Sequence, residues 1–268
     1  MDNRCLLLIY LLAAIILLPA ILLSRDDKEF TFYKLSFRWP PSACNQGSLK
    51  CLPDTLGYFT IHGLWPMYED DTQVPAYDSK KNKCTDVTPT DPKDLLPLLK
   101  SIETTLQKYW PKYNNYANIN MCAESWKHEW KSHGICSDYP ADEPAEYFGA
   151  TLTLAQNYNY DPLKGTKVVP REEPYPAIEI VNAVKEKVKA TPQIQCNKKD
   201  GTLQLLEIRL CFARAKPPGP PIDCPHTFDP QGVCKQETDL IKFTPAPTDS
   251  HGYNQHFEVG MDMKSSFK

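Results

Sequence analysis

The chain carries F-T-I-H-G-L-W-P at Phe59–Pro66 and S-W-K-H-E-W-K-S-H-G-I-C at Ser125–Cys136, and these two motifs hold three of its six histidines. We expect a short strand over Gly57–His62, which ends at the histidine of the first motif. We expect the second motif to lie on a helix over Ala123–His133 that Gly134 ends. A strand end and a helix face can place histidines from both motifs at one cleft.

Three chemical groups of the second motif share one side of the predicted helix. At ~100° per residue, His128, Glu129 and His133 lie on that side, and Ser132 lies between His128 and Glu129. An exposed polar helix face is the alternative interpretation. The additional histidine of the first motif, His62, favours a site, because it stands at a strand end beside glycine and tryptophan.

The rest of the sequence predicts an α+β fold. Alternating or aliphatic runs predict strands over Phe30–Phe37 and Leu203–Phe212. Apolar residues at helical spacing predict a helix over Leu95–Trp110, with Asp94 as its cap. Prolines typical of helix starts stand at Pro144 and Pro176. Strands and helices do not alternate regularly, so a single α+β domain without repeats is predicted.

The composition excludes two classes of protein. With 41% hydrophobic and 11% aromatic residues, the 268-residue chain is not disordered throughout. Its net charge of −3 excludes a polybasic protein that binds nucleic acid by bulk attraction. Any contact with RNA must therefore come from a local site.

The N-terminus has the pattern of a secretory signal peptide over residues 1–24, because Arg4 precedes the apolar run Cys5–Leu23 and polar residues follow. An uncleaved signal anchor is the alternative. Ten cysteines suit the oxidising compartment that either predicts. We expect a folded domain over residues 25–244 and a disordered tail over residues 245–268. The expected location is extracellular, or the lumen of a vacuole or lysosome, without membrane attachment after cleavage.

Two histidines beside a reacting group suit the cleavage of RNA through its own 2′-hydroxyl. A neutral imidazole takes the 2′ proton, an imidazolium protonates the departing 5′ oxygen, and a further donor stabilises charge on phosphorus. The substrate supplies the nucleophile, so neither a metal nor a cofactor is required. A zinc site of the H-E-x-x-H type is disfavoured, because His128 and His133 are five residues apart instead of four.

Both motifs resemble the two catalytic segments of the T2-type secreted ribonucleases. The similarity extends from L-x-x-x-W-P at Leu35–Pro40 to Cys234. It implies a disulfide-stapled domain with a central antiparallel sheet flanked by helices, and cleavage of single-stranded RNA through 2′,3′-cyclic phosphates. The slightly acidic charge favours an S-like enzyme over the self-incompatibility proteins of the family, which tend to be basic.

The resemblance also assigns roles by motif position. It implies that His62 is the general acid and His133 the general base. It further implies that His128 positions the phosphate and that Glu129 is the transition-state carboxylate. Trp65 resembles the aromatic that stacks on a base, although a core tryptophan is an equal alternative.

Two departures from the family pattern concern this site. The family usually has lysine directly before the last histidine of the second motif, where this chain has Ser132. We consider that Lys131 partly replaces this cation while Ser132 offers a neutral hydrogen bond. The alternative is that Lys131 is a solvated surface charge. Phe37 stands where members often have glutamine, which leaves the second base-binding subsite open.

The family pattern implies four disulfides and one free cysteine, Cys122, with Cys51–Cys122 as a competing pair. The implied pairs are Cys44–Cys51, Cys84–Cys136, Cys196–Cys234 and Cys211–Cys224. The expected partner is single-stranded RNA, bound by a monomer without a stable protein partner. The alternative function is that of a catalytically weakened or inactive relative that serves as an RNA-binding, storage or defence protein.

Overall fold

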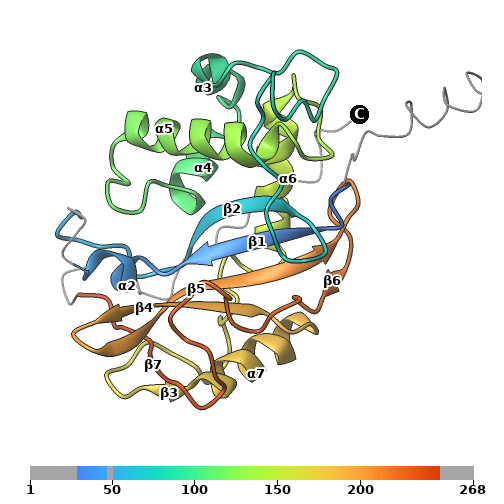
Figure 1. Cartoon of the computed structure of the whole chain (residues 1–268). Helices are drawn as coiled ribbons and strands as arrows, with labels where there is room; N and C mark the ends of the chain where they lie inside the picture. The colour runs from blue at the N-terminus through green and yellow to red at the C-terminus, as the bar shows by residue number, and fades with distance from the viewer. Residues whose placement is uncertain (1–28, 47–50, 248–268) are drawn as a thin grey trace, which may run out of the picture. The chain divides into compact units, whose positions relative to one another are not determined.

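The computed structural model describes residues 29–46 and 51–247, which Figure 1 shows in colour. The predicted signal peptide, and the predicted tail beyond residue 247, lie outside the described residues. Among the described residues, those from Thr31 onward belong to one compact unit. None of the helices described is long and apolar enough to cross a bilayer.

The described strands form one sheet around a long central strand, β5. The strands are β1 (Phe32–Arg38), β2 (Thr60–Met67), β3 (Tyr175–Pro176), β4 (Gln193–Lys199), β5 (Thr202–Ala213), β6 (Pro221–Ile222) and β7 (Leu240–Lys242). β1 and β7 pair along one edge of β5, and β4 and β6 pair along the other. All pairs are antiparallel except β5 with β7. The predicted α+β class with a central sheet is therefore confirmed.

In the described part of the chain, one short helix lies between β1 and β2, four lie between β2 and β3, and one lies between β3 and β4. They are α2 (Pro40–Cys44), α3 (Leu95–Leu98), α4 (Glu103–Tyr109), α5 (Ile119–Glu129), α6 (Pro144–Gln156) and α7 (Ala177–Val188). In Figure 1, α3, α4 and α5 gather near β2, whereas α7 lies away from them beyond β5. α6 begins at the predicted proline, whereas Pro176 is the residue that caps α7 rather than its first residue.

Both faces of β1 are buried, but they carry different residues. Tyr33, Leu35 and Phe37 fill one face, where each is fully buried. Lys34 and Ser36 point to the opposite face, which is also closed to solvent. The sheet therefore has an apolar face and a buried polar face, and the latter must hold its charges in pairs.

The prediction of one continuous helix over Leu95–Trp110 is wrong. The structure divides it into α3 and α4, with tight i→i−3 hydrogen bonds between them, from Leu99 to Leu96 and from Ile102 to Leu99. Pro97 lies in the first turn of α3, where its missing N–H is tolerated, so the break comes from the i→i−3 bonds that replace the α-helical pattern after Leu98. The cap is also different, because the side chain of Asp91, not Asp94, accepts a backbone hydrogen bond.

The strand predicted over Gly57–His62 is also placed differently, because β2 begins at Thr60 and continues to Met67. Pro66 lies inside this strand. Among the described strands, β2 pairs with β1 alone and makes one further isolated bridge, from Met67 to Gln73, so it is an edge strand, in which a missing N–H is tolerated. All of the first motif except Phe59 therefore lies within β2, and His62 is inside the strand and not at its end.

The structure contains four disulfides, and they are the pairs that the resemblance implies: Cys44–Cys51, Cys84–Cys136, Cys196–Cys234 and Cys211–Cys224. Cys122 is free and buried, so the competing pair with Cys51 does not form. Burial raises the pKa of the Cys122 thiol, which makes it less reactive. Cys84–Cys136 ties a surface loop to the end of the second motif.

Removal of Cys84–Cys136 should cost more stability than removal of Cys44–Cys51. The first bridge closes a separation of 52 residues and the second one of 7. Loop-closure entropy then predicts losses of about 4 and about 2 kcal/mol, respectively. Denaturant unfolding of the two double-alanine variants measures both losses. An equal or reversed order would contradict this entropic account.

Candidate active site

His62 lies at a β-bulge in β2. The register pairs Ser36 with Gly63 and Phe37 with Ile61, so His62 has no partner on β1. In a regular strand His62 and Gly63 would point to opposite faces. The bulge turns His62 toward the polar face, and bulges commonly re-aim side chains in this way.

The backbone carbonyl of His62, at the bulge, accepts a hydrogen bond from a side chain outside the sheet. Trp110, which directly follows α4, donates its indole N–H to the carbonyl oxygen of His62 at 2.9 Å. The backbone of the bulge is therefore held from outside the sheet. The side chain of His62 remains 29% exposed, which gives a substrate access to it.

The second motif spans the end of α5 and a π turn. α5 begins earlier than predicted, because Asn118 caps it by accepting hydrogen bonds from two backbone amides of the first turn. The α-helix ends at Glu129, and Trp130–Gly134 continue as a π turn, in which Ile135 donates to the carbonyl of Trp130. Such turns are rare in proteins, and those that occur often lie at functional sites.

The angular positions predicted for the residues beyond Glu129 are wrong, because a π turn replaces the α-helix there. The step of ~100° per residue applies to an α-helix, so it does not place Ser132 or His133 here. In the structure, His133 is buried with 8% of its surface exposed, and Ser132 is half-buried. His128 precedes the turn and is exposed. It is close enough for its charge to lower the pKa of His133.

Trp65 joins the two motifs. Its indole N–H donates to a carboxylate oxygen of Glu129 at 3.2 Å. Its ring centroid lies 5.1 Å from that of His62 and 5.7 Å from that of His133. Only 4% of Trp65 is exposed, so the free protein packs this indole between the two motifs. Its stacking on a base stays a prediction.

Gly63 is required by this contact. A Cβ built on Gly63 would collide with the carboxylate oxygen of Glu129 and with the indole nitrogen of Trp65. The hydrogen bond between these two groups therefore occupies the space of the missing side chain. This explains why glycine follows His62 in the first motif.

Burial sets the protonation of Glu129 and His133. Desolvation raises the pKa of Glu129 to about 8, although the Trp65 hydrogen bond opposes this. Desolvation also lowers the pKa of His133 to about 3, and the nearby charges of His62 and His128 act in the same direction. In acidic to neutral solution, Glu129 is therefore a neutral carboxyl group and His133 a neutral imidazole.

His62 experiences opposing influences. Burial is the largest and lowers its pKa, as does the positive charge of Arg38. The carboxylate of Glu207 raises it. The net direction is downward, but His62, unlike His133, has a carboxylate at 2.8 Å from its Nδ1 atom.

The sequence analysis missed Arg38 and Glu207, which both contact His62. Nη2 of Arg38 lies 3.0 Å from each ring nitrogen of His62 and 2.7 Å from Glu207. The two residues are cross-strand partners in β1 and β5. Polar residues alternate along both strands, with Ser36 and Arg38 on β1 and Glu207 and Arg209 on β5. This alternation was the signal that could have revealed a polar face of the sheet.

Lys131 lies on the surface. The pKa of Asp91 is lowered mainly by hydrogen bonds from Lys93, and the charge of the exposed Lys131 adds a small effect in the same direction. Its part in the site stays a prediction. Arg38 is the cation that lies beside the histidine of the first motif.

Known proteins are similar to this chain in both sequence and fold. The chain is 31% identical over 240 residues to ribonuclease 1 of Arabidopsis thaliana, covering 87% of this chain and 96% of that protein. It is 30% identical over 221 residues to extracellular ribonuclease LE of Solanum lycopersicum, covering 81% and 89%. The crystal structure of RNase NT in complex with 5′-AMP matches with a TM-score of 0.62 and 28% identity, covering 81% of this chain and 99% of that one.

The match to a protein family covers both motifs. Residues 30–224 fit the sequence profile of the ribonuclease T2 family. This range includes every histidine and carboxylate of the site described above, and it agrees with the resemblance inferred from the motifs. The chain belongs to the ribonuclease T2 family.

Proposed function

We propose that this chain is an endoribonuclease that cleaves single-stranded RNA by attack of the 2′-hydroxyl on the adjacent phosphate, forming a 2′,3′-cyclic phosphate. Its family and its relatives support an RNA-cleaving enzyme. The observation that carries the mechanism is the position of His62 and His133, one from each motif, against the same indole of Trp65.

The environments of the two histidines suggest their roles. His62 has the carboxylate of Glu207 beside it, which favours the charged, acidic form. His133 is buried, and its Nδ1 makes no hydrogen bond to any of the described residues. A neutral imidazole is therefore favoured at His133. Burial lowers the pKa of both histidines, but the carboxylate beside His62 opposes this lowering and His133 has no such partner among the causes of its shift. The charged form therefore persists to higher pH at His62 than at His133, and two groups whose surroundings separate their pKa values are suited to act as an acid–base pair.

The proposed step is balanced in protons and electrons. As the bond from O2′ to phosphorus forms, His133 accepts the 2′ proton. As the bond from phosphorus to O5′ breaks, its electron pair stays on O5′ and His62 supplies the proton. The substrate provides the nucleophile, so the mechanism needs no metal or cofactor. Water can then open the cyclic phosphate with the two roles reversed.

Glu129 and Arg38 are placed to stabilise the phosphoryl oxygens. With a pKa of about 8, Glu129 is protonated under acidic conditions and can donate a hydrogen bond to the charge that develops there. Arg38 supplies a permanent positive charge beside His62. We assign to the exposed His128 the positioning of the phosphate, and to Arg38 the cationic role that a lysine usually has in this family.

We further propose that the protein acts as a monomer in an oxidising compartment, either outside the cell or in an endomembrane lumen. Four disulfides support this location. One relative is named an extracellular ribonuclease. A weakened or inactive relative remains the second candidate function, and Ser132 in place of lysine is the feature that favours it.

His62→Ala and His133→Ala should each lower the turnover of RNA by at least ~100-fold, because each removes one partner of the acid–base pair. An RNA analogue with an activated aryl leaving group separates the roles. It needs no acid, so it should restore most activity to His62→Ala but not to His133→Ala. A DNA strand should not be cleaved, and EDTA should not inhibit. Loss of activity with EDTA, or cleavage of DNA, would refute the mechanism.

The pH profile of kcat/KM should be bell-shaped, with its maximum below about 6.5, the usual histidine pKa. The base must be neutral, so activity rises as the pH increases through the pKa of His133, about 3. The acid must be charged, so activity falls as the pH increases through the lowered pKa of His62. A maximum above pH 7 would contradict these assignments.

Arg38→Gln should lower kcat on the order of 100-fold, which is typical for the loss of one donor to a transition-state oxyanion. Lys131→Gln removes the same charge from an exposed position and serves as the matched control. Single-turnover rates with saturating RNA measure both effects. Equal rates in the two variants would remove Arg38 from the site.

A further inference from the structure

We propose that Glu207 is a positioning residue for His62, whose buried carboxylate holds Nδ1 so that Nε2 is the nitrogen that gives up a proton. This inference rests on the proposed role of His62 as the general acid. Glu207 lies in the middle of β5, far from both motifs in the sequence, and it would not touch the RNA.

The contacts of Glu207 fix its orientation. Its side chain is fully buried. Oε1 lies 2.8 Å from Nδ1 of His62 and accepts hydrogen bonds from Arg38 at 2.7 and 3.0 Å. Oε2 accepts from the hydroxyl of Ser36 at 3.0 Å and from Nε of Arg209 at 3.0 Å. Because both oxygens are engaged from different strands, the carboxylate cannot rotate without breaking several bonds.

Its charge is maintained despite the burial. Desolvation alone would raise the pKa of Glu207, but the positive charges of His62, Arg38 and Arg209 hold it well below its usual value. The carboxylate therefore stays ionised under acidic conditions. An ionised acceptor at this place favours a proton on Nδ1 of His62.

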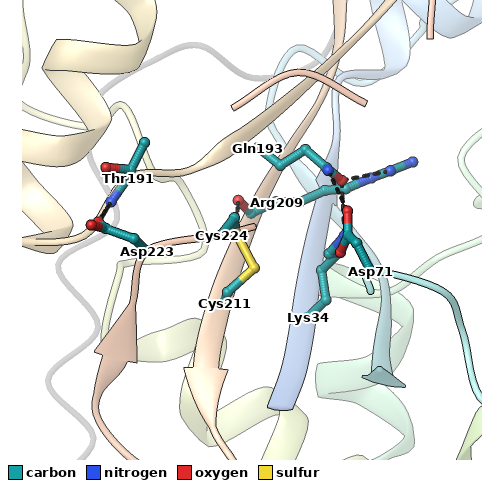
Figure 2. The surroundings of a disulfide bond; sticks show 8 residues. All are labelled: Lys34, Asp71, Thr191, Gln193, Arg209, Cys211, Asp223 and Cys224. Carbon is teal, nitrogen blue, oxygen red and sulfur yellow. Dashed lines mark hydrogen bonds and ion pairs between the residues drawn. A yellow bond between two sulfur atoms is a disulfide. The ribbon is translucent and has the colours of Figure 1, made fainter. Parts of the chain in front are cut away.

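A second row of contacts holds Arg209 in turn. It donates to Asp229 at 2.8 Å and to Gln193 at 3.0 Å. Gln193 also accepts from Lys34 at 2.9 Å and donates to Asp71 at 2.8 Å, and Lys34 pairs with Asp71 (Figure 2). This chain of side chains crosses the polar face of the sheet and restrains Glu207 from behind.

The geometry decides which nitrogen of His62 reacts. Nδ1 faces Glu207, so Nε2 is left to exchange a proton with the leaving oxygen. Nη2 of Arg38 lies 3.0 Å from both ring nitrogens, but Nδ1 keeps its proton toward Glu207, so only Nε2 can accept from Arg38 once its proton has left. Glu207 thus stabilises the charged acid, and Arg38 stabilises the neutral product. Orientation of a catalytic histidine by a carboxylate on its other nitrogen is a general device.

The charged groups that shift the pKa of His62 are Arg38 on β1 and Glu207 and Arg209 on β5. Glu129 and His133 lie against the same indole of Trp65 as His62, and the charge of His62 lowers the pKa of His133. Among these, Glu207 provides the negative charge that contacts the ring. Its neutralisation would leave two arginines beside His62 with nothing to offset them.

The test is an NMR titration of His62 in the full-length protein without RNA, combined with turnover of RNA. Glu207→Gln should lower the pKa of His62 by about 1 unit or more, the size of effect expected from one close charge. It should lower kcat at least tenfold with little change in KM, and Glu207→Asp should restore part of both. Asp229→Asn is the matched control, because it removes a carboxylate from Arg209 but not from His62.

Two results would overturn the proposal: an unchanged titration of His62 in Glu207→Gln, or an equal shift in Asp229→Asn. If Glu207→Gln does not fold, the nitrogen chemical shifts of the wild-type protein decide, because neutral His62 should carry its proton on Nδ1. A proton on Nε2 would refute the assignment. The titration uses no substrate, so a protein that shows the expected shift without cleaving RNA would refute the proposed function alone.

Discussion

A negative charge buried in the sheet, that of Glu207, constrains the structure around it. An unpaired carboxylate in this position would be strongly destabilising, so β1 and β5 must bring Arg38 and Arg209 to it. Their register does this by pairing Arg38 with Glu207 and Ser36 with Arg209. A shift by one residue would move these charges to the apolar face. The polar network therefore specifies the register of the sheet as well as the position of His62.

Two irregular backbone segments bring the histidines together. The bulge in β2 turns His62 to the polar face, and the π turn after α5 carries His133 to the indole of Trp65. Regular elements would not place these side chains in the same way, because each irregularity adds a residue to the local repeat. Glu129 marks the point where the α-helix ends, and its bond to Trp65 links both segments.

The sequence predicted the α+β class, the two motifs and, through the family resemblance, the disulfide pairs. It did not predict the contacts of Arg38 and Glu207, because a charged residue in a strand looks exposed until its partner is known. The α-helical wheel failed beyond Glu129, because a π turn depends on hydrogen bonds that local residue types do not specify. The break between α3 and α4 was missed because the apolar spacing continues across it.

The buried site also determines the conditions in which the fold is most stable. A carboxyl group with a raised pKa, such as Glu129, contributes its full stability below its usual value of 4.5, and this is lost as the pH rises toward about 8. A histidine with a lowered pKa, such as His133, contributes fully above 6.5, and this is lost as the pH falls toward about 3. The two effects oppose each other between these limits, so together they give a plateau of stability in mildly acidic solution. Glu129, which is costly to bury once it ionises, thus makes the fold less stable as the pH rises above this plateau toward about 8.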